Sequence, residues 1–429
     1  MGSIVISNSN GLKGEVIIPP DKSISHRALM FAAIAEGESV IRNLLYAGDV
    51  LSTMKAMRAL SVEIHEGKDE VKVSGRGLRG LREPLDVIDC GNSGTTTRLL
   101  SGILAGNNIY CVITGDDSLK RRPMGRIIKP LREMGAQISA RAYDMYLPMC
   151  IRGGSLRGIQ YVLPVASAQV KSCLILASLY ADGPGVIIEN VQTRDHTERM
   201  LSSMGANIKV SENRIEVSPP LRLDPVEITV PGDFSSAAFF IAAALIVPKS
   251  EVIIRNVLIN PTRAGLLGVL KEMGADIDII NIRETSMEMV SDIVCRYSPN
   301  LNAVKIKNEV VPSMIDEFPI LCVIATRANG TTEIRGAEEL RVKESDRISV
   351  MVKELSRMGA DVVEYPDGVD IRGNTPLNGN TVHSHNDHRV AMSLAIAGLI
   401  ARGVTTIEDV DCVSISFPNF FELLDAIKV

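Results

Sequence analysis

The segment LREMGAQI, residues 131–138, recurs along the chain and decides the fold prediction. Three close copies are LSSMGANI (201–208), LKEMGADI (270–277) and LSRMGADV (355–362), and two weaker copies are MRALSVEI (57–64) and FELLDAIK (421–428). The close copies are typical of an amphipathic helix that ends at a glycine in the C′ position. Six copies, 66 to 85 residues apart, indicate six repeats of one supersecondary unit.

Two further signatures precede each copy. One is a stretch that is apolar on nearly every side, as expected of a fully buried helix; these stretches are 28–35, 97–104, 173–181, 237–246, 318–328 and 390–400. The other is a short run of strand type: SVIRNL (39–44), YCVITG (110–115), GVIIENV (185–191), EVIIRNV (251–257), TTEIRGA (331–337) and VTTIEDV (404–410). Each unit of about 70 residues therefore has an order close to βαβαββ.

Two proline-containing segments divide the repeats into halves. Ile18-Pro19-Pro20-Asp21 and Val230-Pro231-Gly232-Asp233 each lie where a strand ends and a buried helix starts. We therefore expect an α/β (α+β) fold of two similar lobes, each with three units around buried helices. One lobe comprises residues 21–232, and the other comprises residues 1–20 plus 233–429. A ligand is expected in a cleft between two such lobes.

The composition argues against several classes of protein, including disordered, nucleic-acid-binding and membrane proteins. The chain has 429 residues, 23% of them charged and 45% hydrophobic, with a net charge of −5, which argues against disorder and a generally basic nucleic-acid surface. Tryptophan is absent, so an aromatic platform for single-stranded nucleic acid is not expected. No apolar run is long enough for a membrane span, and we expect no export signal from residues 1–14. Seven scattered cysteines without a C-x-x-C pair favour a cytoplasmic location.

A residue of N-cap type stands at the start of every predicted buried helix. The six starts read DKSISHR (21–27), GNSGT (91–95), ASAQVK (166–171), GDFSS (232–236), DEFP (316–319) and NDHR (386–389). Ordinary capping explains any single start. If the three starts of each lobe converge, their free N–H groups instead form an anion site. Cations cluster at the same places: Lys22, Arg27, Arg98, Arg122, Lys171, Arg194, Lys343, Arg347 and Arg389. This combination predicts a small polyanionic ligand.

Two carboxylates stand among these cations. Asp316 and Glu344 are candidates for proton transfer, although an N-cap role for Asp316 and a structural ion pair for Glu344 remain open alternatives. Two other patterns carry little weight. GRGLRG (75–80) matches G-x-G-x-x-G without a following helix or a suitable acidic residue. His383, His385 and His388 are close together in sequence, but no matching set of metal ligands accompanies them.

Seven motifs in register over about 370 residues resemble the 5-enolpyruvylshikimate-3-phosphate synthase family. They are DKSISHRAL (21–29), GNSGTTTRLL (91–100), RRPMGR (121–126), SAQVKS (167–172), GDFSSAAFF (232–240), RVKESDRI (341–348) and NDHRVAM (386–392). The resemblance implies two lobes of three βαβαββ units each, in an inside-out α/β barrel-like arrangement. It also implies transfer of the enolpyruvyl group of phosphoenolpyruvate to the 5-hydroxyl of shikimate 3-phosphate, on the route to chorismate.

The same resemblance implies the partners and the site residues. A monomer without metal or organic cofactor, nucleic acid or membrane is expected, and glyphosate is the family's inhibitor. The catalytic residues would be Asp316, Glu344 and Lys22. The residues for shikimate 3-phosphate would be Lys22, Ser23, Arg27, Ser167, Gln169, Arg194, Asp316 and Lys343. Those for phosphoenolpyruvate would be Lys22, Asn92, Gly94, Arg122, Gln169, Arg347, His388 and Arg389.

The sequence departs from one branch of the family at Leu99, Ala168 and Ile415, where that branch has Pro, Ser and Lys. Together with RDHTER (194–199), these positions place the chain nearer the other bacterial branch. Two alternatives share the scaffold. The sister UDP-N-acetylglucosamine enolpyruvyl transferases typically have a Cys in the loop matching 115–122, where this chain has none. A non-catalytic anion-binding relative is disfavoured because Asp316, Lys343, Glu344 and Arg347 occur together.

Overall fold

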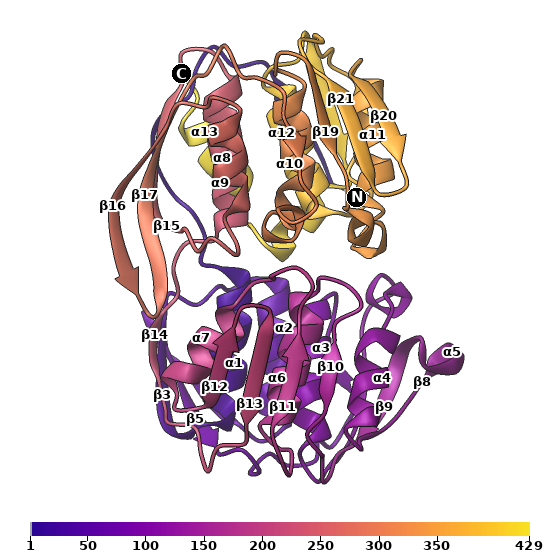
Figure 1. Ribbon diagram of the computed structural model, residues 1–429. Coiled ribbons are helices and arrows are strands. Elements are labelled where there is room, and N and C mark those ends of the chain that lie inside the picture. The colour runs from indigo at the N-terminus through magenta and orange to yellow at the C-terminus, as the bar shows by residue number, and fades with distance from the viewer. Residues whose placement is uncertain (1) are drawn as a thin grey trace. The chain divides into compact units, whose positions relative to one another are not determined.

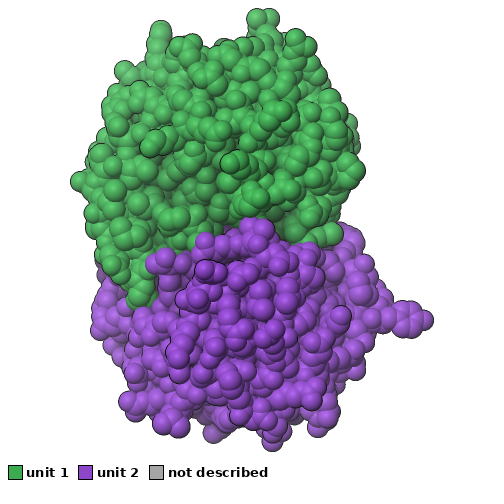
Figure 2. Space-filling model, viewed as in Figure 1, with its two compact units in different colours: residues 1–19, 231–429 green, residues 20–230 purple. Residues whose placement is uncertain are grey.

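In the computed structural model, which describes residues 2–429, the chain forms two compact units (Figure 1). Unit 1 comprises residues 1–19 and 231–429, and unit 2 comprises residues 20–230 (Figure 2). Each unit contains three sheets and three buried helices. The N-terminal strands therefore belong with the C-terminal half of the chain.

Two repeats of unit 2 follow the predicted order from end to end. The first has β6 (Ile88–Asp89), α3 (Gly94–Ala105), β7 (Tyr110–Thr114), α4 (Gly125–Glu133), β8 (Gln137–Ala140) and β9 (Tyr146–Arg152). The second has β10 (Gln160–Val162), α6 (Ala168–Ser178), β11 (Gly185–Ile188), α7 (His196–Ser203), β12 (Asn207–Ser211) and β13 (Arg214–Ser218). In each sheet the first two strands are parallel and the last strand returns between the second and third. This is the βαβαββ unit.

The third repeat of unit 2 takes its first strand from far along the chain. It contains α1 (Lys22–Ile34), β3 (Glu36–Arg42), α2 (Gly48–Ala59), β4 (Glu63–Glu66) and β5 (Glu70–Arg76). The strand parallel to β3 is β14 (Glu227–Thr229), whereas β2 (Lys13–Ile17), which directly precedes α1, pairs with β15 (Glu251–Leu258) of unit 1. The two proline-containing segments join these exchanged strands to the helices that follow them.

Unit 1 repeats the same arrangement. Its first sheet is β16 (Ile277–Thr285), β17 (Glu288–Arg296), β15 and β2, and its second is β18 (Lys305–Ile306), β19 (Thr331–Ile334), β21 (Gly368–Arg372) and β20 (Asp361–Tyr365). The third sheet has β1 (Ser3–Ser7), β23 (Val404–Glu408) and β22 (Thr381–His383), with β1 in the place of the returning strand. The helices are α8 (Phe234–Ile246), α9 (Gly265–Glu272), α10 (Phe318–Ala325), α11 (Arg347–Arg357), α12 (His388–Gly398) and α13 (Phe420–Ala426).

The six apolar stretches are the buried helices, as predicted. Every residue of α8, FSSAAFFIAAALI, is buried, and α8, α10 and α12 contact one another at the centre of unit 1 (Figure 1). In that core the ring of Phe420 packs edge-on against Phe239, Phe240 and Phe417, with ring centroids 5.4 to 5.8 Å apart. Such helices need no polar face because sheets and neighbouring helices surround them.

The predicted glycine stops are also confirmed. Gly135, Gly205, Gly274 and Gly359 follow the amphipathic helices with φ between +82° and +110°, a region that glycine enters without a Cβ clash. In a weaker copy, Ser61 adopts φ +68° at the corresponding turn. The sheets are open and mixed rather than closed barrels. No helix among residues 2–429 is long and apolar enough to cross a membrane.

Candidate functional site

The predicted capping holds at five of the six buried helices. The acceptors are Asp21 for the N–H of Ile24, Ser93 for Thr96, Ser167 for Val170, Asp233 for Ser235 and Asp387 for Arg389, at 2.8 to 3.4 Å. At the sixth helix the N-cap position belongs to Glu317, whose side chain makes no capping hydrogen bond to α10. Asp316 lies one residue earlier, in a 3-10 turn, η3 (Ile315–Glu317).

Side chains from the first two turns bridge the N-terminal ends of the buried helices in unit 2. Arg27 of α1 is buried and donates to the Ser23 carbonyl oxygen at 2.9 Å, Ser172 Oγ of α6 at 2.9 Å and Thr197 Oγ1 of α7 at 2.8 Å. Gln169 at the start of α6 donates to Thr95 Oγ1 at the start of α3, 3.0 Å away. The convergence predicted for the three helices holds within this unit.

Lys22 begins α1 and has a partner that the sequence did not reveal. Its Nζ lies 3.0 Å from Asp49 Oδ2 in the first turn of α2, and both side chains are mostly buried. An acidic residue in a first helical turn is expected from the helix dipole alone, so Asp49 carried no specific signal. The ammonium is thus fixed by a carboxylate from a neighbouring helix.

A second group of cations surrounds the start of α3. Arg122 donates to Asn92 Oδ1 at 2.6 Å and to its carbonyl oxygen at 3.2 Å, and Asn92 donates to Asp116 at 2.7 Å. Arg98 donates to Gln169. A Cβ on Gly94 would lie 3.1 Å from Arg98 Nη1 and 3.5 Å from Arg122 Nη1. A side chain at position 94 would therefore crowd the Arg98 guanidinium and touch that of Arg122.

Two predicted cations of unit 2 lie apart from these contacts. Lys171 is fully buried, and its ammonium binds Glu189 at 3.0 Å, Glu198 at 2.7 Å and the Thr193 carbonyl oxygen at 3.1 Å. Counting Lys171 among the ligand-binding cations was wrong, because a lysine with this set of partners is structural. Arg194 is half-buried in the segment before α7.

In unit 1, Arg347 joins most of the predicted residues. Its guanidinium, 1% exposed, donates to Asp316 Oδ1 at 3.2 Å, Glu344 Oε2 at 2.6 Å and Asp387 Oδ2 at 2.8 Å. Arg389 adds a contact of 3.5 Å to Asp316 Oδ2. The starts of α10, α11 and α12 therefore meet at one guanidinium. The structural ion pair proposed as an alternative for Glu344 is present.

Lys343 lies beside this cluster and has an unusual ammonium. Its pKa is lowered from 10.5 to about 8, chiefly because the ammonium is removed from water. Asp316 opposes this shift, the positive charge of Arg347 adds to it, and Glu339 and Glu344 oppose it more weakly. Arg347 shows the reverse effect, because Asp387, Glu344 and Asp316 together outweigh its burial and raise its pKa. Lys343 can thus change charge just above neutral pH.

His388 is buried in the first turn of α12.

These contacts correct the picture of an excess of positive charge. In unit 1, Arg347, Arg389 and Lys343 are balanced by Asp316, Glu344 and Asp387. The sequence indicated Asp387 only as a helix cap. Its Oδ1 accepts the capping hydrogen bond from the backbone N–H of Arg389, and its Oδ2 also binds the Arg347 guanidinium. A buried guanidinium requires such partners, because an unpaired buried charge is costly.

Another buried network ties Asp316 to α8. Glu317, the residue after Asp316, accepts from Arg263 Nη1 at 3.0 Å and from Ser235, and Arg263 Nη2 donates to Asp233 Oδ1 at 2.9 Å. The backbone at Asp316 is thereby fixed against the start of α8. Nothing in the sequence around Arg263 indicated this role.

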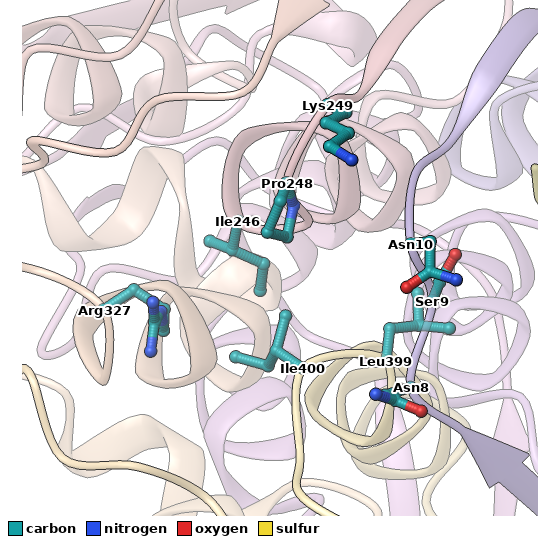
Figure 3. Close-up of a pocket in the computed structure, with 9 residues that line it drawn as sticks. All are labelled: Asn8, Ser9, Asn10, Ile246, Pro248, Lys249, Arg327, Leu399 and Ile400. Atoms are coloured by element: carbon teal, nitrogen blue, oxygen red, sulfur yellow. The ribbon is translucent and has the colours of Figure 1, made fainter.

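A pocket of about 340 Å³ in unit 1 lies at the opposite ends of the same helices (Figure 3). Its walls come from the ends of α8, α10 and α12 and from the segment after β1: Asn8, Ser9, Asn10, Ile246, Pro248, Lys249, Arg327, Leu399 and Ile400. Lys249 and Arg327 stand at helix C-termini, where positive side chains offset the helix dipole. Their positions need no ligand, and none of the predicted site residues lines this pocket.

The family described as EPSP synthase (3-phosphoshikimate 1-carboxyvinyltransferase) matches residues 6–424. The 3-phosphoshikimate 1-carboxyvinyltransferase of Thermodesulfovibrio yellowstonii is 53% identical over 426 residues, covering 99% of each chain. That of Persephonella marina is 50% identical over 425 residues, covering 98% of each.

Solved structures agree with these relatives. An EPSP synthase from Acinetobacter baumannii superposes with a TM-score of 0.87 at 44% identity, covering 99% of this chain and 98% of that one. The enolpyruvyl transferase NikO from Streptomyces tendae gives a TM-score of 0.80 at 17% identity, covering 99% and 96%. The likeness to NikO concerns the fold alone.

Proposed function

We infer, because the chain belongs to the EPSP synthase family, that it transfers the carboxyvinyl (enolpyruvyl) group of phosphoenolpyruvate to shikimate 3-phosphate. The reaction releases phosphate and is a step in aromatic amino acid biosynthesis. The observation that carries this conclusion is the match of the family to residues 6–424, with about half of all residues identical in full-length relatives. The roles of individual residues are proposals and rest on the contacts described above.

We assign the binding residues of unit 2 to two groups. Shikimate 3-phosphate is bound by Ser23, Arg27, Ser167, Gln169 and Arg194. The fixed guanidinium of Arg27 and the free N–H groups at helix starts support this role, since both favour a phosphate.

Phosphoenolpyruvate is bound by Asn92, Gly94, Arg122 and Gln169, and Lys22 contacts both substrates. Gly94 leaves room beside Arg98 and Arg122.

We assign the residues of unit 1 in the same way. Arg347, Arg389 and His388 bind phosphoenolpyruvate, and Lys343 binds shikimate 3-phosphate. The direct contacts of Arg347 and Arg389 with Asp316 support placing binding and proton transfer together. Arg347 is held by three carboxylates, so its donors are fixed in direction before any substrate arrives.

The chemistry requires two proton movements at C3 of phosphoenolpyruvate. C3 gains a proton while the 5-oxygen of shikimate 3-phosphate bonds to C2, giving a tetrahedral adduct. C3 then loses a proton as the bond between C2 and the phosphate oxygen breaks. We assign Asp316 to accept the proton of the 5-hydroxyl. Protonated Glu344 gives C3 its proton, with the Lys22 ammonium as a further acid, and the Glu344 carboxylate takes a proton back from C3 as phosphate leaves. Both carboxylates contact the Arg347 guanidinium, which places them beside the proposed binding donors.

Release of inorganic phosphate tests the activity directly. The enzyme is incubated with phosphoenolpyruvate and either shikimate 3-phosphate or UDP-N-acetylglucosamine. Phosphate release only with shikimate 3-phosphate is expected. Release only with the UDP sugar would assign the sister activity, and release with neither acceptor would indicate a non-catalytic relative.

A further inference from the structure

The turn between β22 and α12 is held in a conformation that ordinary residues rarely adopt. His385 and Asn386 have φ angles of +54° and +58°, and neither is a glycine. Histidine and asparagine enter the left-handed region more readily than most residues, but two such residues in succession still need support from surrounding contacts. This turn leads directly into Asp387, His388 and Arg389. The strain therefore lies immediately before the residues assigned to phosphoenolpyruvate.

Glu354 of α11 supplies the contacts that hold the first half of the turn. Its carboxylate is completely buried, and Oε1 lies 2.9 Å from Nε2 of His385. The other oxygen accepts from the backbone N–H of His383 at 3.1 Å and from Arg357 at 3.3 Å. A buried carboxylate needs such partners, and His385 is the side chain of the turn that provides one.

The same helix holds the second half of the turn. Arg347 and Glu354 are seven residues apart on α11, which is about two helical turns, so they lie on one face. Arg347 binds Asp387 at 2.8 Å, and Glu354 binds His385 at 2.9 Å. Helix α11 thus fixes the turn on both sides of Asn386.

We propose that the Glu354–His385 pair is a positioning pair for Arg389. By holding the turn in its left-handed conformation, the pair sets the path of the chain into α12 and the direction of the Arg389 guanidinium. Neither residue needs to contact a substrate. The inference rests on the proposed role of Arg389 in binding phosphoenolpyruvate. It also gives a function to His385, one of three histidines whose spacing first drew attention to a metal site.

Three single variants test the positioning role by steady-state kinetics. His385→Ala removes the contact with Glu354, and we expect about a tenfold rise in KM for phosphoenolpyruvate. The change in kcat should be less than about threefold, because misdirection of Arg389 weakens ground-state and transition-state binding alike. His385→Gln keeps an N–H donor and should restore KM to within about threefold of the wild type. Glu408→Ala breaks the neighbouring His383–Glu408 pair of 3.0 Å and serves as the matched control, with an unchanged KM.

A double variant with Arg389→Lys distinguishes the positioning role of His385 from the proposed binding of phosphoenolpyruvate by Arg389. If His385 acts through Arg389, the double variant His385→Ala/Arg389→Lys should raise KM little beyond Arg389→Lys alone. Multiplication of the two effects would overturn the positioning role, as would a His385→Ala enzyme with wild-type KM. An equal fall in activity for both substrates, unrelieved by His385→Gln, would show a merely structural role. If Arg389→Lys itself left the KM for phosphoenolpyruvate unchanged, the proposed site would fail instead.

Discussion

Lys343 should make the enzyme sensitive to pH just above neutrality. Its pKa of about 8, lowered chiefly because its ammonium is removed from water, predicts about nine-tenths protonation at pH 7 and about one-tenth at pH 9. If the positive charge binds shikimate 3-phosphate, kcat/KM for that substrate should fall roughly tenfold per pH unit above pH 8. In Lys343→Arg the group stays charged throughout this range, so the fall should disappear.

The assay is kcat/KM for shikimate 3-phosphate between pH 6.5 and 9.5, because this ratio reports ionisations of the free enzyme and free substrate. The phosphate groups of the substrates ionise at lower pH and affect wild type and variant alike, so the difference between the two profiles isolates Lys343. A wild-type profile that stays flat to pH 9.5 would refute the reasoning. An identical fall in Lys343→Arg would assign the ionisation to another group.

The same shift has a consequence for stability. Between about pH 8 and 10.5 the unfolded chain binds more protons at Lys343 than the folded chain does. Its contribution to the free energy of unfolding therefore rises with pH in this window and is lost as the pH falls through 8. Lys343→Met should flatten this part of the profile measured by denaturant unfolding. A wild-type slope that survives the substitution would contradict the lowered pKa.

Three further substitutions test the proposed site. Asp316→Asn keeps an acceptor for Arg347 but removes the base, so kcat should fall about 10²- to 10⁴-fold while the melting temperature changes little; a fully active variant would transfer the role to Glu344 and Lys22. Gly94→Ala places a Cβ 3.1 Å from Arg98 Nη1, so KM for phosphoenolpyruvate should rise and inhibition by glyphosate should weaken; equal inhibition of both enzymes would remove Gly94 from the site. Lys22→Met should raise the Kd of both substrates, each by about 10- to 150-fold for one charged hydrogen bond, whereas unchanged calorimetric affinities would exclude Lys22 as a shared contact.

The repeat made much of the fold predictable. Six strands and six buried helices recur with local signals, and glycines such as Gly135 and Gly359 mark helix ends by a conformation that few other residues adopt. The exchange of β2 and β14 was not predictable in the same way. In sequence, β2 directly precedes α1 and β14 directly precedes α8. In the fold, β2 pairs with β15 and β14 pairs with β3, each far away along the chain. Strand pairing over such separations leaves no local pattern.

The candidate site was also predictable only in part. Motifs identified cations and acids at helix starts, because capping and helix dipoles have local sequence signatures. They could not show which cations were already occupied. Lys171 lies at a helix start and yet is enclosed by Glu189 and Glu198, whereas Lys22 at a similar position pairs with Asp49. Ion pairs of this kind depend on side chains from separate elements, so only the folded chain reveals them.

The three carboxylates around Arg347 differ in a way that links binding to catalysis. Asp387 is completely buried, whereas the side chains of Asp316 and Glu344 are 17% and 19% exposed. A guanidinium has five N–H donors, so donors remain for a substrate anion beside those directed at the three carboxylates. The completely buried Asp387 holds the Arg347 guanidinium in place. The two partners that water reaches are the groups assigned to proton transfer. In the proposed function, Arg347 therefore keeps Asp316 and Glu344 beside the donors that bind the substrate anion, so the substrate and the reacting carboxylates meet at one guanidinium.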